Sequence, residues 1–92
     1  MTLLTEEQIA TRLGGVPGWD LHGDSIVATV TRADFRDALL YVGAVGYLAE
    51  AANHHPDVAI SWNKVTLTLS THSAGGLTGA DFDLAERISR LA

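Results

Sequence analysis

Residues 57–71, DVAISWNKVTLTLST, constrain the fold most, because apolar and polar residues alternate on both sides of a short break. The apolar positions are Val58, Ile60 and Trp62 before the break and Val65, Leu67 and Leu69 after it. A period of two places alternate side chains on one face of a strand, and Asn63-Lys64 supplies the turn between the two runs. The pattern predicts an antiparallel hairpin with one apolar face.

A second hairpin is predicted nearer the N-terminus. Gly23-Asp24 is a turn signal, flanked by a short segment at 19–22 and by the β-branched run 26–31. Two hairpins, each with a short connection, favour an antiparallel sheet of four strands.

Three helices are expected to cover that sheet. Thr5 and Gln8 have the spacing of an N-terminal capping box, and Gly14-Gly15 ends the helix that follows. Thr78 and Asp81 repeat the capping spacing before the last helix, with Leu77 stapled to Phe82.

The middle helix is predicted over 32–53, because this segment contains no proline and ends before Pro56. The apolar stripe expected to face the core is Phe35, Leu39, Val42, Val45 or Gly46, and Ala49.

The order α-β-β-α-β-β-α predicts an α+β fold, a four-stranded antiparallel sheet with helices packed on one face. A chain of 92 residues buries one core, so a single domain is expected over 1–92. A small domain gains stability by sharing apolar surface with a copy of itself, and we therefore expect a homo-oligomer, either dimer or tetramer.

Composition excludes several classes of function. Eleven acidic residues against six Lys and Arg provide no basic surface for direct nucleic-acid binding. The absence of cysteine excludes disulfides and thiolate metal sites. Neither a signal peptide nor a run of about 18 apolar residues is found, so we expect no membrane partner and a cytoplasmic protein.

The stretch NHHPD, residues 53–57, holds two of the four histidines. His54 falls at the C-terminal end of the middle helix, where exposed carbonyls favour an imidazolium that can act as a general acid. Pro56 holds His55 extended, so the two imidazoles are expected to point in different directions. A structural interpretation also stands, since a histidine at a helix end often only caps it.

Other candidate residues have similar alternatives. The capping box accounts for Asp81 without any substrate, and Glu50 could be a solvated helix residue. Trp19 and Trp62 could belong to the core or an interface, or stack on a planar ring. Three histidines and a carboxylate could bind a metal, but no spacing places two imidazoles on one face of one element.

These positions resemble the signature of the pterin-4a-carbinolamine dehydratase family. The matching residues, at the family's spacing, are Glu50, His54-His55-Pro56, Trp62, His72 and Asp81. The blocks GWDLHGDSI, DFRDAL, AEAANHHPD and THSAGGLTGADFDLA resemble the family's blocks in the same order, from Leu4 to Ile88. Several positions at fixed spacing form a more specific signal than any single motif.

The resemblance implies the same α+β fold and the activity of a 4a-hydroxytetrahydrobiopterin dehydratase, a carbon-oxygen lyase of tetrahydropterin recycling. Such an enzyme converts 4a-hydroxy-tetrahydropterin to quinonoid dihydropterin and water, with no metal or organic cofactor. The hydroxyl needs a proton donor and the ring nitrogen a proton acceptor, and imidazole serves either need near neutral pH.

The resemblance also implies roles for individual residues. By position, His54 and His72 match the acid/base histidines, without deciding which donates. His55 matches the histidine that mainly binds and orients the pterin. Asp81 matches the acid that holds a histidine and contacts the site. Substrate-binding candidates also include Glu50 at the edge of the site and the aromatic residues Trp62 and Trp19.

Three points qualify this interpretation. Trp62 stands where the family often has tyrosine, and VATVTRADF lacks the family's usual paired aromatics. Counting by two from Leu67 and Leu69 places His72 on the polar face of its strand.

Relatives also act as dimerisation partners of a transcription factor or as assembly scaffolds, so a non-catalytic dimerisation, assembly or coactivator module is the alternative function. Another pterin pathway is a third possibility.

Overall fold

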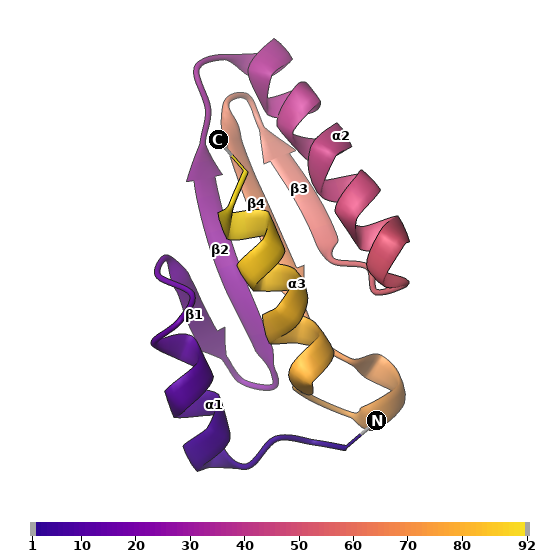
Figure 1. The fold of residues 1–92 in the computed structure, drawn as a ribbon. Helices are drawn as coiled ribbons and strands as arrows, with labels where there is room; N and C mark the ends of the chain where they lie inside the picture. The colour runs from indigo at the N-terminus through magenta and orange to yellow at the C-terminus, as the bar shows by residue number, and fades with distance from the viewer. Residues whose placement is uncertain (1, 92) are drawn as a thin grey trace.

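A computed structural model describes residues 2–91, and its strands form one antiparallel sheet in the order β1-β2-β4-β3 (Figure 1). The strands are β1 (Trp19–His22), β2 (Ser25–Thr31), β3 (Asp57–Ser61) and β4 (Lys64–Leu69). The helices are α1 (Glu6–Leu13), α2 (Phe35–Ala52) and α3 (Gly79–Ser89), with a 3₁₀ turn, η1 (His72–Ala74), after β4. The predicted fold class and element order are therefore confirmed.

Strand register places the apolar positions of the two central strands on one face. Ile26 lies opposite Leu69, Ala28 opposite Leu67, and Val30 opposite Val65. Five of these six are buried, and Val30 is partly buried against the core. α3 crosses the middle of this face, with α1 to one side and α2 to the other (Figure 1). The opposite face carries polar residues, including the paired hydroxyls of Thr29 and Thr66.

Both predicted capping boxes form. In α1, the backbone N–H of Gln8 donates to the Thr5 hydroxyl and the N–H of Thr5 donates to the Gln8 side chain. In α3, the N–H of Thr78 donates to Asp81, and the Thr78 hydroxyl accepts from the first turn of the helix. Each box satisfies N–H groups that have no partner inside the helix.

The middle helix starts later than predicted. α2 begins at Phe35 because Asp34 is its N-cap, and the Asp34 side chain accepts a hydrogen bond from the N–H of Asp37 at 2.7 Å. Arg32 lies before the helix and forms an ion pair with Asp37. The predicted end is confirmed, since the last helical residue is Ala52.

The inward face of α2 also differs in part from the predicted stripe. Its buried residues are Ala38, Tyr41, Val45 and Ala49. Phe35 and Leu39, assigned to the core from their spacing, are about half exposed. Apolar residues occur on almost every side of α2, so periodicity alone did not determine which side packs against the sheet.

The β3–β4 turn lies one residue earlier than predicted. Ser61 pairs with Lys64, so the two turn residues are Trp62 and Asn63 instead of Asn63-Lys64. Trp62 has a φ of 52°, a left-handed conformation that is uncommon for a bulky residue. In the described part of the chain, no helix is long and apolar enough to cross a bilayer.

Candidate active site

The site forms where α2 ends. Asn53 adopts a left-handed conformation with φ 49° and ψ 43°, which Asn tolerates better than most residues. Its N–H donates to the carbonyl oxygens of Ala49 and Glu50, and the N–H of His54 also donates to that of Ala49. The helix therefore closes with its carbonyls paired, and the chain turns at Asn53 before it enters β3.

That turn directs His54 towards the first turn of α3. Its Nε2 lies 2.5 Å from Oδ1 of Asp81, although the two residues are 27 positions apart in the sequence. The side chain of His54 is 14% exposed and that of Asp81 is 0% exposed. The predicted role of Asp81 in holding a histidine therefore has a direct geometric counterpart.

The buried carboxyl group of Asp81 needs hydrogen-bond partners, because burying a carboxylate costs free energy unless hydrogen bonds replace those it made with water. Oδ2 accepts from the Thr71 hydroxyl at 2.8 Å and from the N–H of Thr78 at 2.9 Å. Nε2 of His54 lies against Oδ1, so three polar groups converge on one carboxyl group. Because a carboxylate can only accept hydrogen bonds, these contacts favour a hydrogen on Nε2 of His54.

The adjacent histidine has a different environment. Nε2 of His55 forms a hydrogen bond with Oε2 of Glu50, which lies five residues earlier in the sequence, on α2. The His55 and Glu50 side chains are 56% and 78% exposed. The prediction that the two histidines point in different directions agrees with this pairing. A contact between two solvent-exposed side chains contributes little to the stability of the fold.

Thr71 was not singled out from the sequence. It follows β4, is buried, and its hydroxyl lies 2.9 Å from that of Thr78 as well as bonding to Asp81. A threonine at a strand end has no distinctive local signal, so only tertiary contacts reveal it.

His72 follows Thr71 directly and begins η1, where its side chain is exposed. β4 ends at Leu69, so strand parity does not determine which way His72 points. Its backbone is thus next to the Asp81 network.

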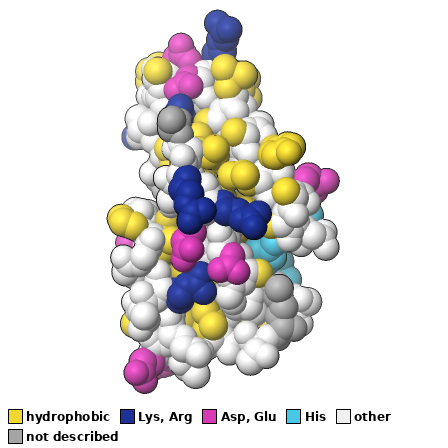
Figure 2. All heavy atoms as spheres, in the orientation of Figure 1, with side chains coloured by type: hydrophobic (Ala, Val, Ile, Leu, Met, Phe, Trp, Pro, Cys, Tyr) yellow, Lys and Arg dark blue, Asp and Glu magenta, His cyan; other side chains and the backbone are white. Residues whose placement is uncertain are grey.

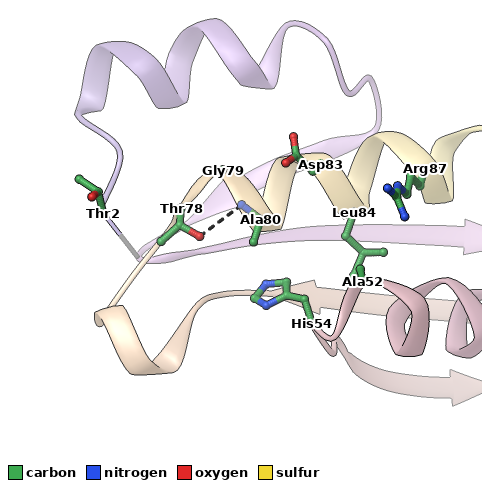
Figure 3. A pocket seen from close by; sticks show the side chains of 9 residues that line it. All are labelled: Thr2, Ala52, His54, Thr78, Gly79, Ala80, Asp83, Leu84 and Arg87. Atoms are coloured by element: carbon green, nitrogen blue, oxygen red, sulfur yellow. Dashed lines mark hydrogen bonds between the residues drawn. The ribbon is translucent and has the colours of Figure 1, made fainter.

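A hollow of about 410 Å³ opens beside His54. It is lined by Thr2, Ala52, His54, Thr78, Gly79, Ala80, Asp83, Leu84 and Arg87. Figure 3 shows the His54 ring, from the segment after α2, facing the beginning of α3. Histidine side chains reach the surface together near the end of α2, beside a mixture of basic and acidic groups (Figure 2). The site is therefore open to a small molecule.

The two tryptophans lie elsewhere in the chain. Trp19 is buried in the core and lines a separate hollow with Ala28 and Tyr41. Trp62 is exposed at the far end of β3, about 16 Å of extended strand away from the histidine pair. A single chain does not bring either indole beside His54.

A metal-binding cluster is not found either. Within residues 2–91, no three His, Asp or Glu side chains are gathered in a way that could hold a metal ion.

His54 has one ring nitrogen available. Nε2 is engaged by Asp81, whereas Nδ1 has no hydrogen bond to any residue in the range 2–91. A neutral Nε2–H imidazole can accept a proton at Nδ1, and the cation can donate one from there. Fold and site together define a small α+β protein with a histidine–carboxylate centre suited to proton transfer.

Comparison with known proteins identifies the family. The model of the family described as pterin 4 alpha carbinolamine dehydratase matches residues 2–91. A protein of Nocardia farcinica is 54% identical over 90 residues, covering 98% of this chain and 95% of its own. One of Roseiflexus castenholzii is 52% identical over 89 residues, covering 97% and 96%. Both carry the name pterin-4-alpha-carbinolamine dehydratase as a provisional assignment.

A solved structure agrees. The crystal structure of a transcriptional coactivator/pterin dehydratase from Brucella melitensis superposes with a TM-score of 0.89 at 30% identity, covering 95% of each chain. This chain belongs to the pterin-4a-carbinolamine dehydratase family.

Proposed function

We propose that this protein dehydrates a 4a-hydroxy-tetrahydropterin to the quinonoid dihydropterin in tetrahydropterin recycling. The carbon–oxygen bond at C4a breaks, and the hydroxyl leaves as water with a proton from a general acid. The neighbouring ring nitrogen loses its proton to a general base, and a carbon–nitrogen double bond forms. No electron is transferred, so two imidazoles can supply every proton movement.

The observation that carries this proposal is the buried hydrogen bond between His54 and Asp81. This bond engages Nε2 of His54 on the buried side of the ring and leaves Nδ1 for a bound molecule. His54 and His72 are the proposed acid/base pair, and Asp81 orients His54. His55 and its partner Glu50, exposed at the rim, are proposed to bind the pterin.

The assay is the ultraviolet absorbance change of a 4a-hydroxy-tetrahydropterin generated in situ. We expect the wild type to accelerate its decay and His54→Ala to lower kcat about a hundredfold, the range typical of removing a general acid or base. His22→Ala is the matched control, because His22 lies in β1 and belongs to no site described above. A wild-type rate no higher than that of a His54→Ala, His72→Ala double variant would refute the dehydratase proposal.

We extend the proposal to a homo-oligomer. The outer face of α2 exposes Phe35, Leu39, Leu40 and Tyr47, and a second copy covering it would remove this apolar surface from water. Leu40→Glu is expected to lower the mass measured by light scattering, whereas a wild-type monomer would contradict the idea. The same face could serve a coactivator or assembly role, which inactivity in the decay assay would favour.

A further inference from the structure

The two oxygens of Asp81 have different partners. Oδ1 faces Nε2 of His54, whereas Oδ2 accepts from the Thr71 hydroxyl and the Thr78 N–H. Oδ2 accepts from two donors on separate segments and the Asp81 side chain is 0% exposed, so the carboxylate cannot rotate without losing buried hydrogen bonds. The direction of Oδ1 thus depends on groups that never touch His54.

Thr71 is itself held rigidly. Its N–H donates to the carbonyl of Gly76 at 2.9 Å, and its carbonyl accepts from the N–H groups of Ala74, Gly75 and Gly76. This small loop contains η1 and ends at Gly75, whose φ of 79° suits glycine. The hydroxyl of Thr71 is therefore presented to Asp81 from a fixed backbone.

The protons in this network have one consistent direction. An ionised carboxylate only accepts, so the Thr71 hydroxyl spends its single proton on Asp81. The hydroxyls of Thr71 and Thr78 lie 2.9 Å apart, and with the Thr71 proton on Asp81 this contact fits Thr78 as the donor. Among residues 2–91, Oδ2 of Asp81 thus receives two donors, from Thr71 and Thr78, and Oδ1 is left facing His54.

We propose that Thr71 is a positioning residue of the active site. Its hydroxyl fixes Asp81 so that the proton of neutral His54 stays on Nε2 and Nδ1 remains free for the substrate. Thr71 also sets the backbone position of the adjacent His72, so one residue serves both proposed acid/base histidines. The kinetic consequence rests on the dehydratase proposal, but the effect on the His54 tautomer does not.

Thr71→Val tests the hydroxyl, since valine has nearly the same shape but cannot donate. We expect kcat to fall about tenfold with KM changed less than about twofold, as for the loss of one hydrogen bond to a charged group. Thr71→Ser, which keeps the hydroxyl, should recover most of the rate. Thr66→Val is the matched control, because Thr66 lies in β4 and its hydroxyl faces Thr29.

The second measurement is the ring-nitrogen NMR spectrum of uniformly ¹⁵N-labelled protein, with His54 assigned from the signals lost in His54→Gln. In the wild type, Nε2 should carry a proton whether the ring is neutral or cationic. In Thr71→Val, part of the neutral ring should shift its proton to Nδ1. The serine variant and the Thr66 control should keep the wild-type pattern.

The outcomes separate the two proposals. An unchanged His54 spectrum and rate in folded Thr71→Val overturn the positioning role. If the valine variant does not fold, Thr71→Ser and Thr71→Ala differ by the hydroxyl alone, and equal spectra for this pair also overturn it. If the wild type is inactive towards the pterin, the dehydratase proposal fails, and the spectra alone decide the role of Thr71.

Discussion

The first and last helices begin with the same capping box in very different surroundings. In α1, Thr5 and Gln8 exchange hydrogen bonds of 2.9 and 3.1 Å at an exposed position. In α3, Thr78 and Asp81 do so where both are buried. The first box only starts a helix. The second contains a carboxylate that has lost its water and therefore requires further donors, which Thr71 and His54 provide.

The difference shows how one side chain can both cap a helix and contact a histidine. The amide of Gln8 is neutral and accepts one backbone hydrogen bond. The carboxylate of Asp81 has a second oxygen to spare after capping the helix, and burial strengthens whatever that oxygen binds. Capping and orientation of His54 are thus two uses of one side chain, so the structural and chemical interpretations of Asp81 are compatible.

The largest expected effect comes from Asp81→Asn, which keeps the shape of the second box and removes its charge. If the amide oxygen accepts from the Thr78 N–H, the amide NH₂ faces Nε2 of His54 and forces the proton to Nδ1. We expect kcat to fall at least about a hundredfold and the free energy of unfolding to fall by about 2–4 kcal/mol. Pterin kinetics and urea denaturation measure the two quantities.

Asp83→Asn is the control for this substitution. Asp83 lies on the same helix, but its side chain is 70% exposed and pairs with Arg12. Its loss should change stability by less than about 1 kcal/mol and leave the His54 tautomer as it is. Equal losses of stability, with the His54 tautomer changed alike in both variants, would mean that the buried box has no special role.

A smaller contrast is expected between Thr78→Ala and Thr5→Ala. Each removes one capping hydroxyl, which typically costs about 0.5–2 kcal/mol. Thr78→Ala should lie at or above the upper end of that range, because the buried hydroxyl also contacts Thr71. Thr5→Ala should lie near the lower end. Urea denaturation of both variants gives the comparison, and equal losses would contradict the claimed effect of burial.

The sequence was sufficient for the two boxes because a capping box is a local pattern over four residues. The sequence did not predict that one box is exposed and the other buried, because burial depends on how α3 packs on the sheet. His54 and Asp81 are 27 positions apart, so no local pattern predicts their contact, and only the family resemblance placed both residues in one site. Thr71 begins a block that resembles the family, but neither its local pattern nor the family signature marks it as a site residue.

Two errors have related causes. α2 is apolar on its outer side as well, which made the choice of Phe35 and Leu39 as core residues wrong. The turn was placed at Asn63-Lys64 because asparagine favours turns, whereas the structure puts Trp62 in a left-handed conformation. The preference of asparagine for turns is outweighed by the strand register that buries Val65 and Leu67.

The smallest effect is expected at the start of α2, where the N-cap is the carboxylate of Asp34. The other two helices have threonine hydroxyls at this position. The pKa of Asp37 is lowered from its ordinary value of 3.8, first by the hydrogen bond from the Ala33 N–H and then by Arg32. A carboxylate with a lowered pKa stabilises the fold above that ordinary value and loses the effect as pH falls through the lowered one. Asp37→Asn should therefore be less stable than wild type at pH 7, and the gap should close below pH 3.8 in urea denaturation series. Thr5→Ala, which removes an uncharged cap, should show a gap that does not depend on pH, and a constant gap for Asp37→Asn would show that its charge contributes nothing.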